Sequence, residues 1–175
     1  MSVPLDSEKR VYTARMPLIH EAPGIKALID EAVKEGSVLP RTLSELCESL
    51  RDFEVVVDEQ GVAGCAALHI DTESLAEIRS LVVRKDLRGR DIGSVLVEAC
   101  IAEARKLGIK QVYALTRVPQ FFHKLGFYLV DKQELPSKVF KDCVRCHLFP
   151  GCDELAVLAD IAHAPEDEIQ GRMEG

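Results

Sequence analysis

The sequence lacks the features that would place this protein in a membrane, in the secretory pathway or on nucleic acid. No uninterrupted apolar run approaches the ~20 residues that a membrane-spanning helix requires. The first ten residues, MSVPLDSEKR, contain no apolar signal-peptide core. Lysine and arginine (22) are outnumbered by aspartate and glutamate (29), and the resulting net charge of -7 opposes general nucleic-acid binding. We therefore expect a cytoplasmic protein that binds neither membranes nor nucleic acid.

The sequence also lacks an internal repeat and any sign of a second domain. Its 175 residues suffice for one domain with a single core, and its 47% hydrophobic and 29% charged residues are ordinary for a globular protein. We expect a flexible tail over residues 1–10, one domain over residues 11–160 and a flexible acidic tail over residues 161–175.

Hydrophobic periodicity and turn residues predict a mixed α/β sheet with helices on both faces. Thr42 and Glu45 form a capping-box pattern at the start of one of the helices, and Gly36 ends the helix before it. The predicted strands cover residues 11–15, 53–57, 62–70, 75–83, 111–116, 127–130 and 155–158. The predicted helices cover residues 25–33, 42–50, 94–107 and 121–125.

The most informative segment is the strand–turn–helix over residues 75–107. The strand LAEIRSLVV leads into the basic turn RKDLRGRDIGS, and the turn leads into an amphipathic helix that Gly108 ends. Backbone N–H groups at a helix N-terminus bind anions, and Arg88 and Arg90 can pair with phosphate oxygens. Gly89 and Gly93 let the backbone approach a ligand closely. A solvated turn without a ligand is the alternative, since short glycine motifs are permissive.

This turn resembles the pyrophosphate loop of the GNAT N-acetyltransferases, which bind acetyl-coenzyme A. The family pattern is Arg/Gln-x-x-Gly-x-Gly/Ala, and Arg88 and Gly93 match its first and last positions, whereas Asp91 replaces a glycine. Aspartate tolerates a left-handed backbone, but its charge is unfavourable beside a pyrophosphate. The segment Val82-Val83-Arg84 is similar to the one whose backbone pairs with the pantetheine arm.

The segment Pro119–Phe127, PQFFHKLGF, resembles the short helix and Leu-Gly-Phe turn of the same family. Many members carry a tyrosine at the position of Phe122, and that tyrosine protonates the departing thiolate. Phe122 cannot do so, which leaves Tyr113, Tyr128 or an unassisted thiolate with a pKa near 8.5. The coenzyme-binding residues that the resemblance implies are Leu81, Val82, Val83, Arg88, Gly89, Arg90, Asp91, Ile92, Gly93, Ser94 and Phe122.

Three further segments resemble the short, stand-alone bacterial amino-acid N-acetyltransferases, the N-acetylglutamate synthases. They are Lys34–Leu43, with its Leu-Pro-Arg, Leu75–Leu81 and Asp142–Glu154. Together with the loop, the resemblance covers roughly residues 11–160. It implies a GNAT fold, with a mixed, mostly antiparallel central sheet, and an enzyme that acetylates the α-amino group of L-glutamate or L-glutamine in arginine biosynthesis. A homodimer is compatible with it.

Amine acetylation requires a base, because only the unprotonated amine attacks a thioester. Glu77 is the candidate base, as a glutamate often is at this position in the family; alternatively it is the solvent-facing residue of an alternating strand. A backbone N–H near Leu81 or Val82 could stabilise the oxyanion. His69 and His123 are candidate proton relays.

The carboxylates of an amino-acid acceptor are best matched by arginine forks. Arg79, on the same strand face as Glu77, is the first candidate and Arg41 the second; Lys138 or Arg117 could contribute. Ser80 and Thr116 could hydrogen-bond substrate. Two other functions stay open: acetylation of another small amine or a protein, and coenzyme-dependent regulation without catalysis, which the departures at Asp91 and Phe122 would suit.

No metal is expected. Cys47, Cys65 and Cys100 lie in apolar-patterned segments and are interpreted as small buried hydrophobic residues. Cys143, Cys146 and Cys152, with His147 beside them, have the spacing of a zinc cluster, but adjacent Cys146 and His147 fit one tetrahedron poorly. Reduced thiols without metal are the favoured interpretation.

Overall fold

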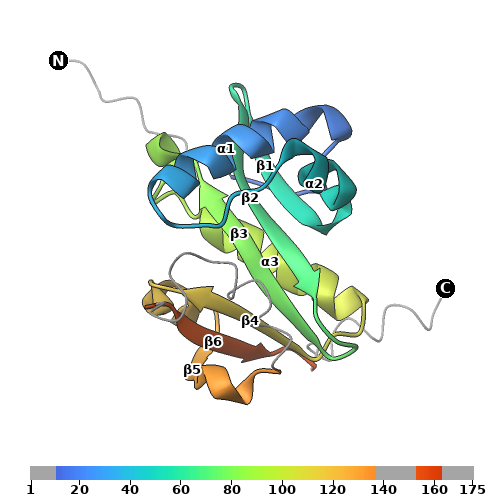
Figure 1. The fold of residues 1–175 in the computed structure, drawn as a ribbon, viewed down its shortest axis with the longest axis vertical. Coiled ribbons are helices and arrows are strands. Elements are labelled where there is room, and N and C mark those ends of the chain that lie inside the picture. Colours follow the sequence, from blue (N-terminus) through green and yellow to red (C-terminus); the bar gives the residue numbers. More distant parts are fainter. Residues whose placement is uncertain (1–10, 137–152, 163–175) are drawn as a thin grey trace.

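A six-stranded mixed sheet forms the centre of the computed structural model, which describes residues 11–136 and 153–162. The strand order is β1-β2-β3-β4-β6-β5 (Figure 1). All neighbouring strands run antiparallel except β3 and β4, which are parallel. The strands are β1 (Phe53–Asp58), β2 (Gly61–Ile70), β3 (Leu75–Val83), β4 (Gln111–Thr116), β5 (Tyr128–Val130) and β6 (Leu155–Asp160).

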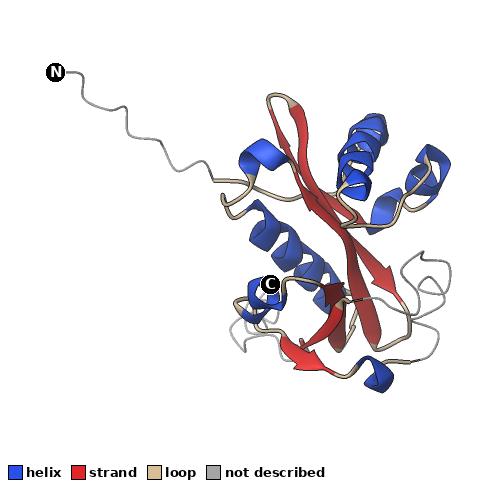
Figure 2. Ribbon diagram, turned by 60° about the vertical axis from the view of Figure 1, so that its left-hand side comes forward, coloured by secondary structure: helices blue, strands red, loops and turns tan. Residues whose placement is uncertain are grey.

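Helices cover both faces of this sheet, as the sequence predicts (Figure 2). The α-helices are α1 (Ala22–Lys34), α2 (Leu43–Glu48), α3 (Ile92–Lys106) and α4 (Pro119–His123). Short 3-10 helices span Ile19–Glu21, Leu50–Asp52, Lys85–Leu87 and Lys132–Glu134. Helices α1 and α2 pack on one face of β1, β2 and β3, and α3 packs on the opposite face.

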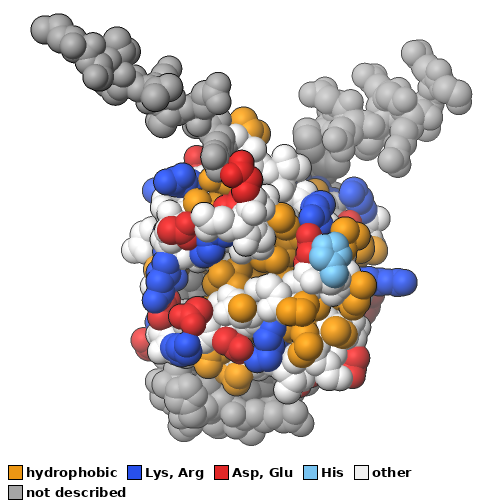
Figure 3. Space-filling model, turned by 90° about the horizontal axis from the view of Figure 1, so that it is seen from above, with side chains coloured by type: hydrophobic (Ala, Val, Ile, Leu, Met, Phe, Trp, Pro, Cys, Tyr) orange, Lys and Arg blue, Asp and Glu red, His pale blue; other side chains and the backbone are white. Residues whose placement is uncertain are grey.

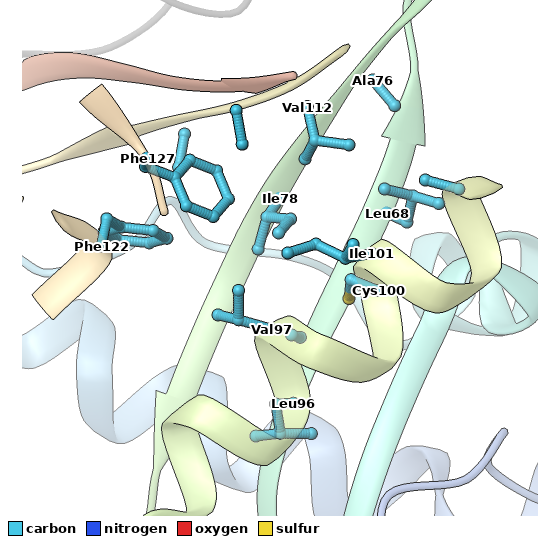
Figure 4. Packing of buried hydrophobic residues seen from close by; sticks show 14 of the residues in the cluster. Leu68, Ala76, Ile78, Leu96, Val97, Cys100, Ile101, Val112, Phe122 and Phe127 are labelled. Carbon is cyan, nitrogen blue, oxygen red and sulfur yellow. The ribbon is translucent and has the colours of Figure 1, made fainter. Parts of the chain in front are cut away.

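The larger core lies between α3 and the sheet (Figure 4). Leu96, Val97, Cys100 and Ile101 of α3 meet apolar side chains of β2, β3 and β4, such as Ile78. Phe122 of α4 closes this core, with its ring centroid 5.2 Å from that of Phe127 in an edge-to-face arrangement.

The opposite face of the sheet carries two smaller cores. One lies under α1 and α2, where Ile25, Ile29 and Leu46 are fully buried against β1 and β2. The other surrounds Leu75 and Tyr113 over β3, β4 and β6. Glu77 and Arg79 of β3 also lie on this face, and they are the polar side chains of the candidate site.

The capping box that the sequence predicts before α2 is confirmed. The Thr42 side chain accepts a hydrogen bond from the Glu45 N–H at 3.1 Å, and Glu45 accepts one from the Thr42 N–H at 2.7 Å. Gly36, with φ of 72°, follows α1 in the left-handed region that glycine adopts without strain. These two signals fix the connection between α1 and α2.

Two predictions about local structure are wrong. The segment over residues 11–15 is not a strand, because only Arg15 pairs with the sheet, as an isolated bridge to Val55. Cys47 is exposed, since it lies on the outer face of α2, whereas Cys65 and Cys100 are buried as expected. Helix α3 begins at Ile92, two residues before the predicted start at residue 94. The expected tails and the three cysteines Cys143, Cys146 and Cys152 lie outside the described residues, apart from residues 161 and 162.

The Arg15–Glu21 pair gives a testable prediction about the N-terminal segment. Glu21 accepts two hydrogen bonds from Arg15, at 2.6 and 2.9 Å, and these bonds lower the pKa of Glu21 from 4.5 to about 2. A lowered pKa adds stability above the unfolded value of 4.5 that is lost as pH falls toward 2. We expect Glu21→Gln to lower the free energy of unfolding by about 1 kcal/mol at pH 7 and by almost nothing near pH 2. Urea titrations of both proteins measure this, and an equal loss at both pH values would contradict it.

Charged side chains of both signs lie among hydrophobic ones on the face seen from above, where no extended basic patch is present (Figure 3). Within the described part of the chain, no helix has the length and apolar character needed to cross a bilayer.

Candidate active site

The site lies where β3 and β4 separate. Register pairs join these parallel strands only from Leu75 to Glu77 on β3, opposite Gln111 to Tyr113 on β4. Beyond Glu77, β3 remains paired with β2 alone. The Arg84 N–H donates to the Ala63 carbonyl at 2.8 Å, so the alternation of an antiparallel ladder directs the backbone groups of Val83 toward β4. Within the part of the chain that the structure describes, no strand pairs with this edge of β3, where the Val83 carbonyl accepts a hydrogen bond from Arg88 Nε at 3.5 Å.

A bulge changes the direction of side chains along β3. Ser80 has φ of 53°, a left-handed value that is uncommon outside glycine, and the register with β2 shifts between Cys65 and Ala67 at the same place. The Cys65 thiol donates to the Ser80 carbonyl at 3.4 Å. Before the bulge, Glu77 and Arg79 share one face of β3, as the sequence predicts, and their side chains are in contact.

Glu77 is buried rather than facing solvent. Its side chain is 13% exposed and accepts a hydrogen bond from Arg79 Nε at 3.1 Å, while the Tyr113 hydroxyl lies 3.3 Å away. Burial raises the pKa of Glu77, and the nearby Asp71 adds to this effect, whereas the charge of Arg79 opposes it. A buried carboxyl with a raised pKa is suited to accept a proton near neutral pH.

The loop after β3 forms a backbone cradle at the start of α3. Gly89 and Asp91 both have left-handed backbones, with φ of 79° and 64°, and Asp91 is the N-cap of this 15-residue helix. The first N–H groups of a helix have no intrahelical partner. A Cβ added at Gly93 would lie 3.2 Å from the Phe121 ring, so glycine allows close packing there. The backbone of this loop accommodates Asp91 in the left-handed region, and anion binding by the loop stays a prediction.

Two arginines of the predicted site have partners in this structure. Arg88 donates to Glu35, at the end of α1, at 3.0 Å, although its side chain is 53% exposed. Arg79 is 18% exposed, and its guanidinium holds Glu77. Arg41 lies between α1 and α2, close enough for its positive charge to act on the pKa of the buried Cys65 thiol, which is raised by burial. The loop that carries Arg41 joins α1 and α2, which pack on the face of the sheet where Arg79 lies beside Ala67.

Several predicted contacts are limited by burial. Phe122 is 4% exposed and packs in the larger core, and its contact with the coenzyme stays a prediction. The side chain of Val82 is buried, and those of Leu81 and Val83 pack against the larger core, which leaves their backbone for a ligand. The Thr116 hydroxyl accepts from the Val118 N–H at 2.9 Å in the turn after β4 and is buried, and its contact with substrate stays a prediction.

The sequence reasoning missed Asp71 and Glu35. Asp71 follows β2 directly. His69, two residues earlier, lies opposite Glu77 in the β2–β3 register, so Asp71 is near the candidate base and contacts Tyr113. The hairpin spacing could have revealed it. Glu35 contacts Arg88 from a different part of the chain, which no local pattern indicates. Among residues 11–136 and 153–162, no group of three or more acidic, histidine or cysteine side chains could hold a metal ion.

A mostly buried carboxyl lies beside the point where β3 and β4 separate, near the loop before α3, and comparison with known proteins gives the family. The family model described as the acetyltransferase (GNAT) family matches residues 25–127. The chain therefore belongs to the GNAT acetyltransferase family. An uncharacterized N-acetyltransferase of Chlorobaculum tepidum is 35% identical over 138 residues, which cover 79% of this chain and 89% of that protein.

Two amino-acid acetyltransferases are also similar. That of Mycobacterium tuberculosis is 32% identical over 73% of this chain and 74% of its own length. That of Mannheimia succiniciproducens is 29% identical over 71% of this chain, but the match spans 29% of its own length.

Solved structures confirm the expected GNAT fold. N-acetylglutamate synthase from Neisseria gonorrhoeae, complexed with coenzyme A and N-acetyl-glutamate, superposes with a TM-score of 0.78 at 26% identity, over 89% of this chain and 36% of that one. A Mycobacterium tuberculosis protein in complex with coenzyme A gives a TM-score of 0.74 at 26% identity, over 85% and 98% of the two chains.

Proposed function

We propose that this protein transfers the acetyl group of acetyl-coenzyme A to the α-amino group of L-glutamate, as in the first step of arginine biosynthesis. The buried Glu77–Arg79 pair beside the open edge of β3 is the observation that carries this proposal. The similarity to amino-acid acetyltransferases and to N-acetylglutamate synthase supports it.

The coenzyme would lie along the open edge of β3 and end at α3. The backbone groups of Val83 would pair with the pantetheine amides, and the N–H groups from Gly89 to Ser94 would receive the pyrophosphate. Arg88 and Arg90 would add positive charge, and Glu35 would release Arg88 when a phosphate oxygen takes its place. Acetyl-coenzyme A acts here as a co-substrate, and no metal is required.

Glu77 would remove the proton that prevents the acceptor amine from attacking. The free amine then attacks the thioester carbonyl, and a backbone N–H of Leu81 or Val82, beside the bulge at Ser80, would stabilise the oxyanion. The coenzyme leaves as a thiolate, which a pKa near 8.5 permits without an acid. Tyr128, whose hydroxyl donates to Asp160 at 2.8 Å on an exposed strand, is poorly placed to act as that acid.

Arg79, with Arg41 on the same face, would bind the carboxylates of the acceptor. An arginine fork matches a carboxylate in charge and geometry. L-Glutamine is a close rival, because it keeps the α-carboxylate and replaces only the second one by an amide. Ser80, which follows Arg79 at the bulge in β3, is a candidate hydrogen-bond partner of the acceptor.

A thiol-release assay with acetyl-coenzyme A tests the proposed function. We expect turnover with L-glutamate or L-glutamine and less with aspartate, whose second carboxylate lies one methylene closer to the amine. We expect little with polyamines, because Arg79 and Arg41 match carboxylates and would repel a second ammonium group. Fastest turnover of a polyamine or a protein amine would favour the second enzymatic function. Coenzyme binding by calorimetry without turnover of any amine would favour a regulator, which Asp91 and the buried Phe122 suit.

Asp91 provides a further prediction, about coenzyme affinity. Because its charge lies at the proposed pyrophosphate site, we expect Asp91→Asn and Asp91→Gly both to lower the KM for acetyl-coenzyme A about two- to fivefold. Asparagine and glycine both tolerate the left-handed backbone, so the free energy of unfolding should change by less than about 1 kcal/mol. Steady-state kinetics and urea titration measure the two effects. An effect of glycine alone would assign the gain to the backbone instead of the charge.

A further inference from the structure

A chain of polar side chains leads away from Glu77 through Tyr113, which lies near Oε2, the same carboxylate oxygen that Arg79 contacts. The Tyr113 hydroxyl lies 3.3 Å from Glu77 Oε2 and donates to Asp71 Oδ2 at 2.8 Å. Asp71 Oδ1 lies 3.6 Å from His69 Nε2. Glu77, Tyr113 and Asp71 are all nearly buried, whereas the His69 side chain is 30% exposed. The groups therefore connect a buried carboxyl to the surface.

The Tyr113 hydroxyl has a single proton and two carboxyl neighbours. It can donate to only one of them, and the shorter distance selects Asp71. The phenol oxygen can then accept a hydrogen bond from Glu77, but only when Glu77 is protonated. Both hydrogen bonds of the Tyr113 hydroxyl therefore form only when Glu77 is protonated. Glu77 is in that state after it removes a proton from an amine.

The proposed reaction makes such a connection necessary. An acceptor that enters as an ammonium ion and leaves as an amide releases one proton per turnover when the thiol product is neutral. Glu77 is 13% exposed, and bound substrates would cover it further. Unless that proton leaves, Glu77 cannot act again as a base.

We propose that Tyr113, Asp71 and His69 relay the proton from Glu77 to solvent. This inference rests on the proposed function, which gives Glu77 its proton, and adds three residues that act through Glu77 without touching the substrate. Among residues 11–136 and 153–162, the charged and titratable groups that the structure places along the relay are Glu77 and Arg79 of β3, Tyr113 of β4, and His69 and Asp71 at the end of β2.

Each transfer in the relay conserves protons and charge. Glu77 gives its proton to the Tyr113 oxygen as Tyr113 gives its own proton to Asp71, so the phenol stays neutral throughout. This matters because burial and the two carboxylates raise the pKa of Tyr113, which makes a free phenolate unfavourable. Asp71 then passes the proton to His69 Nε2 after a rotation that shortens 3.6 Å to a hydrogen bond of ~2.9 Å. His69 releases a proton to water.

A purely structural role for these residues is the competing explanation, since a buried tyrosine usually has a partner. A structural role affects folding and substrate binding. A relay affects the rate at which protons leave Glu77 for solvent. A small proton carrier in solution can therefore replace His69, the exposed end of the relay.

The first test does not depend on activity. The pKa of Glu77 is measured by carbon NMR on protein labelled at the glutamate carboxyl carbons, with the Glu77 signal assigned from Glu77→Gln. We expect Asp71→Asn to lower the pKa of Glu77, because it removes the negative charge that the phenol connects to it. An unchanged pKa would show that the two carboxyls are not coupled and would overturn the relay. This holds even if the wild type acetylates no amine, which would refute the proposed function alone.

The second test is kinetic and uses the amine that the wild type acetylates fastest. We expect His69→Gln and Tyr113→Phe to lower kcat about tenfold with little change in the KM for acetyl-coenzyme A. The kcat of His69→Gln should rise with imidazole concentration toward the wild-type value, while Tyr113→Phe, which breaks the chain internally, should respond less. A kcat of His69→Gln that is independent of imidazole would overturn the relay.

Matched variants serve as controls. Tyr128→Phe also removes a hydroxyl that donates to a carboxylate, that of Asp160, and His20→Gln removes an exposed histidine of the 3-10 helix Ile19–Glu21. Both should keep the wild-type kcat and remain insensitive to imidazole.

Discussion

We expect Glu77→Gln to lower kcat about 10²- to 10³-fold, with a much smaller change in the KM for acetyl-coenzyme A. A positioned general base typically contributes this range, and glutamine keeps the shape and the hydrogen-bonding oxygen of Glu77 while removing its basicity. The effect belongs to the proton transfer, because the proposed coenzyme contacts lie at Val83 and in the loop that begins at Arg88, at the other end of β3.

The loss should depend on pH in a defined way. Burial raises the pKa of Glu77, so the base form is populated only above that raised value and the wild-type rate falls as pH decreases through it. Near the pKa of the acceptor amine, free amine is abundant and a base matters less. The ratio of the wild-type rate to the Glu77→Gln rate should therefore be largest between the raised pKa of Glu77 and the pKa of the acceptor amine. The ratio should decrease at lower and at higher pH.

Rate profiles against pH for Glu77→Gln and for Glu73→Gln check this expectation. Glu73 is an exposed glutamate in the turn before β3 and should behave as the wild type. Equal rates for Glu77→Gln and wild type at every pH would remove Glu77 from the mechanism.

Local patterns were sufficient for most elements of the fold. The bounds of β3 and β4 coincide with those predicted, because turn residues on both sides of an apolar run fix where a strand begins and ends. The capping box at Thr42 holds because all of its hydrogen bonds lie within one turn of helix. The predicted strand over residues 11–15 failed because an alternating pattern cannot show whether a neighbouring strand is available.

The site was only partly predictable for the same reason. Glu77 and Arg79 share a face two residues apart, which the period of a strand shows directly. The bulge at Ser80 changes that period and depends on a register with β2 that the sequence does not display. Asp71 meets Tyr113 across 42 residues of sequence, and Glu35 meets Arg88 across 53, so only the folded chain reveals these pairs.

Replacement of Arg79 should produce the largest change in acceptor affinity. Its guanidinium is 18% exposed and already holds Glu77 through Nε and a terminal nitrogen at 3.1 and 3.0 Å. Loss of a charge-assisted hydrogen bond costs about 1.5–3 kcal/mol, so we expect Arg79→Lys to raise the KM for L-glutamate about 10- to 100-fold. Lysine keeps the positive charge, and kcat should change less than KM.

Arg79→Gln separates the two roles of this residue. Because the positive charge of Arg79 lowers the pKa of Glu77 and thereby opposes the effect of burial, its removal should raise that pKa further. The fall in rate at low pH should then begin at a higher pH than in the wild type or in Arg79→Lys. Steady-state kinetics across pH measure both effects, and Arg105→Lys, on α3 behind the opposite face of the sheet, is the matched control. An unchanged KM for glutamate in both Arg79 variants, together with the shifted profile, would restrict Arg79 to the support of Glu77. The acceptor carboxylates would then be assigned to Arg41, because its positive charge lies on the same face of the sheet.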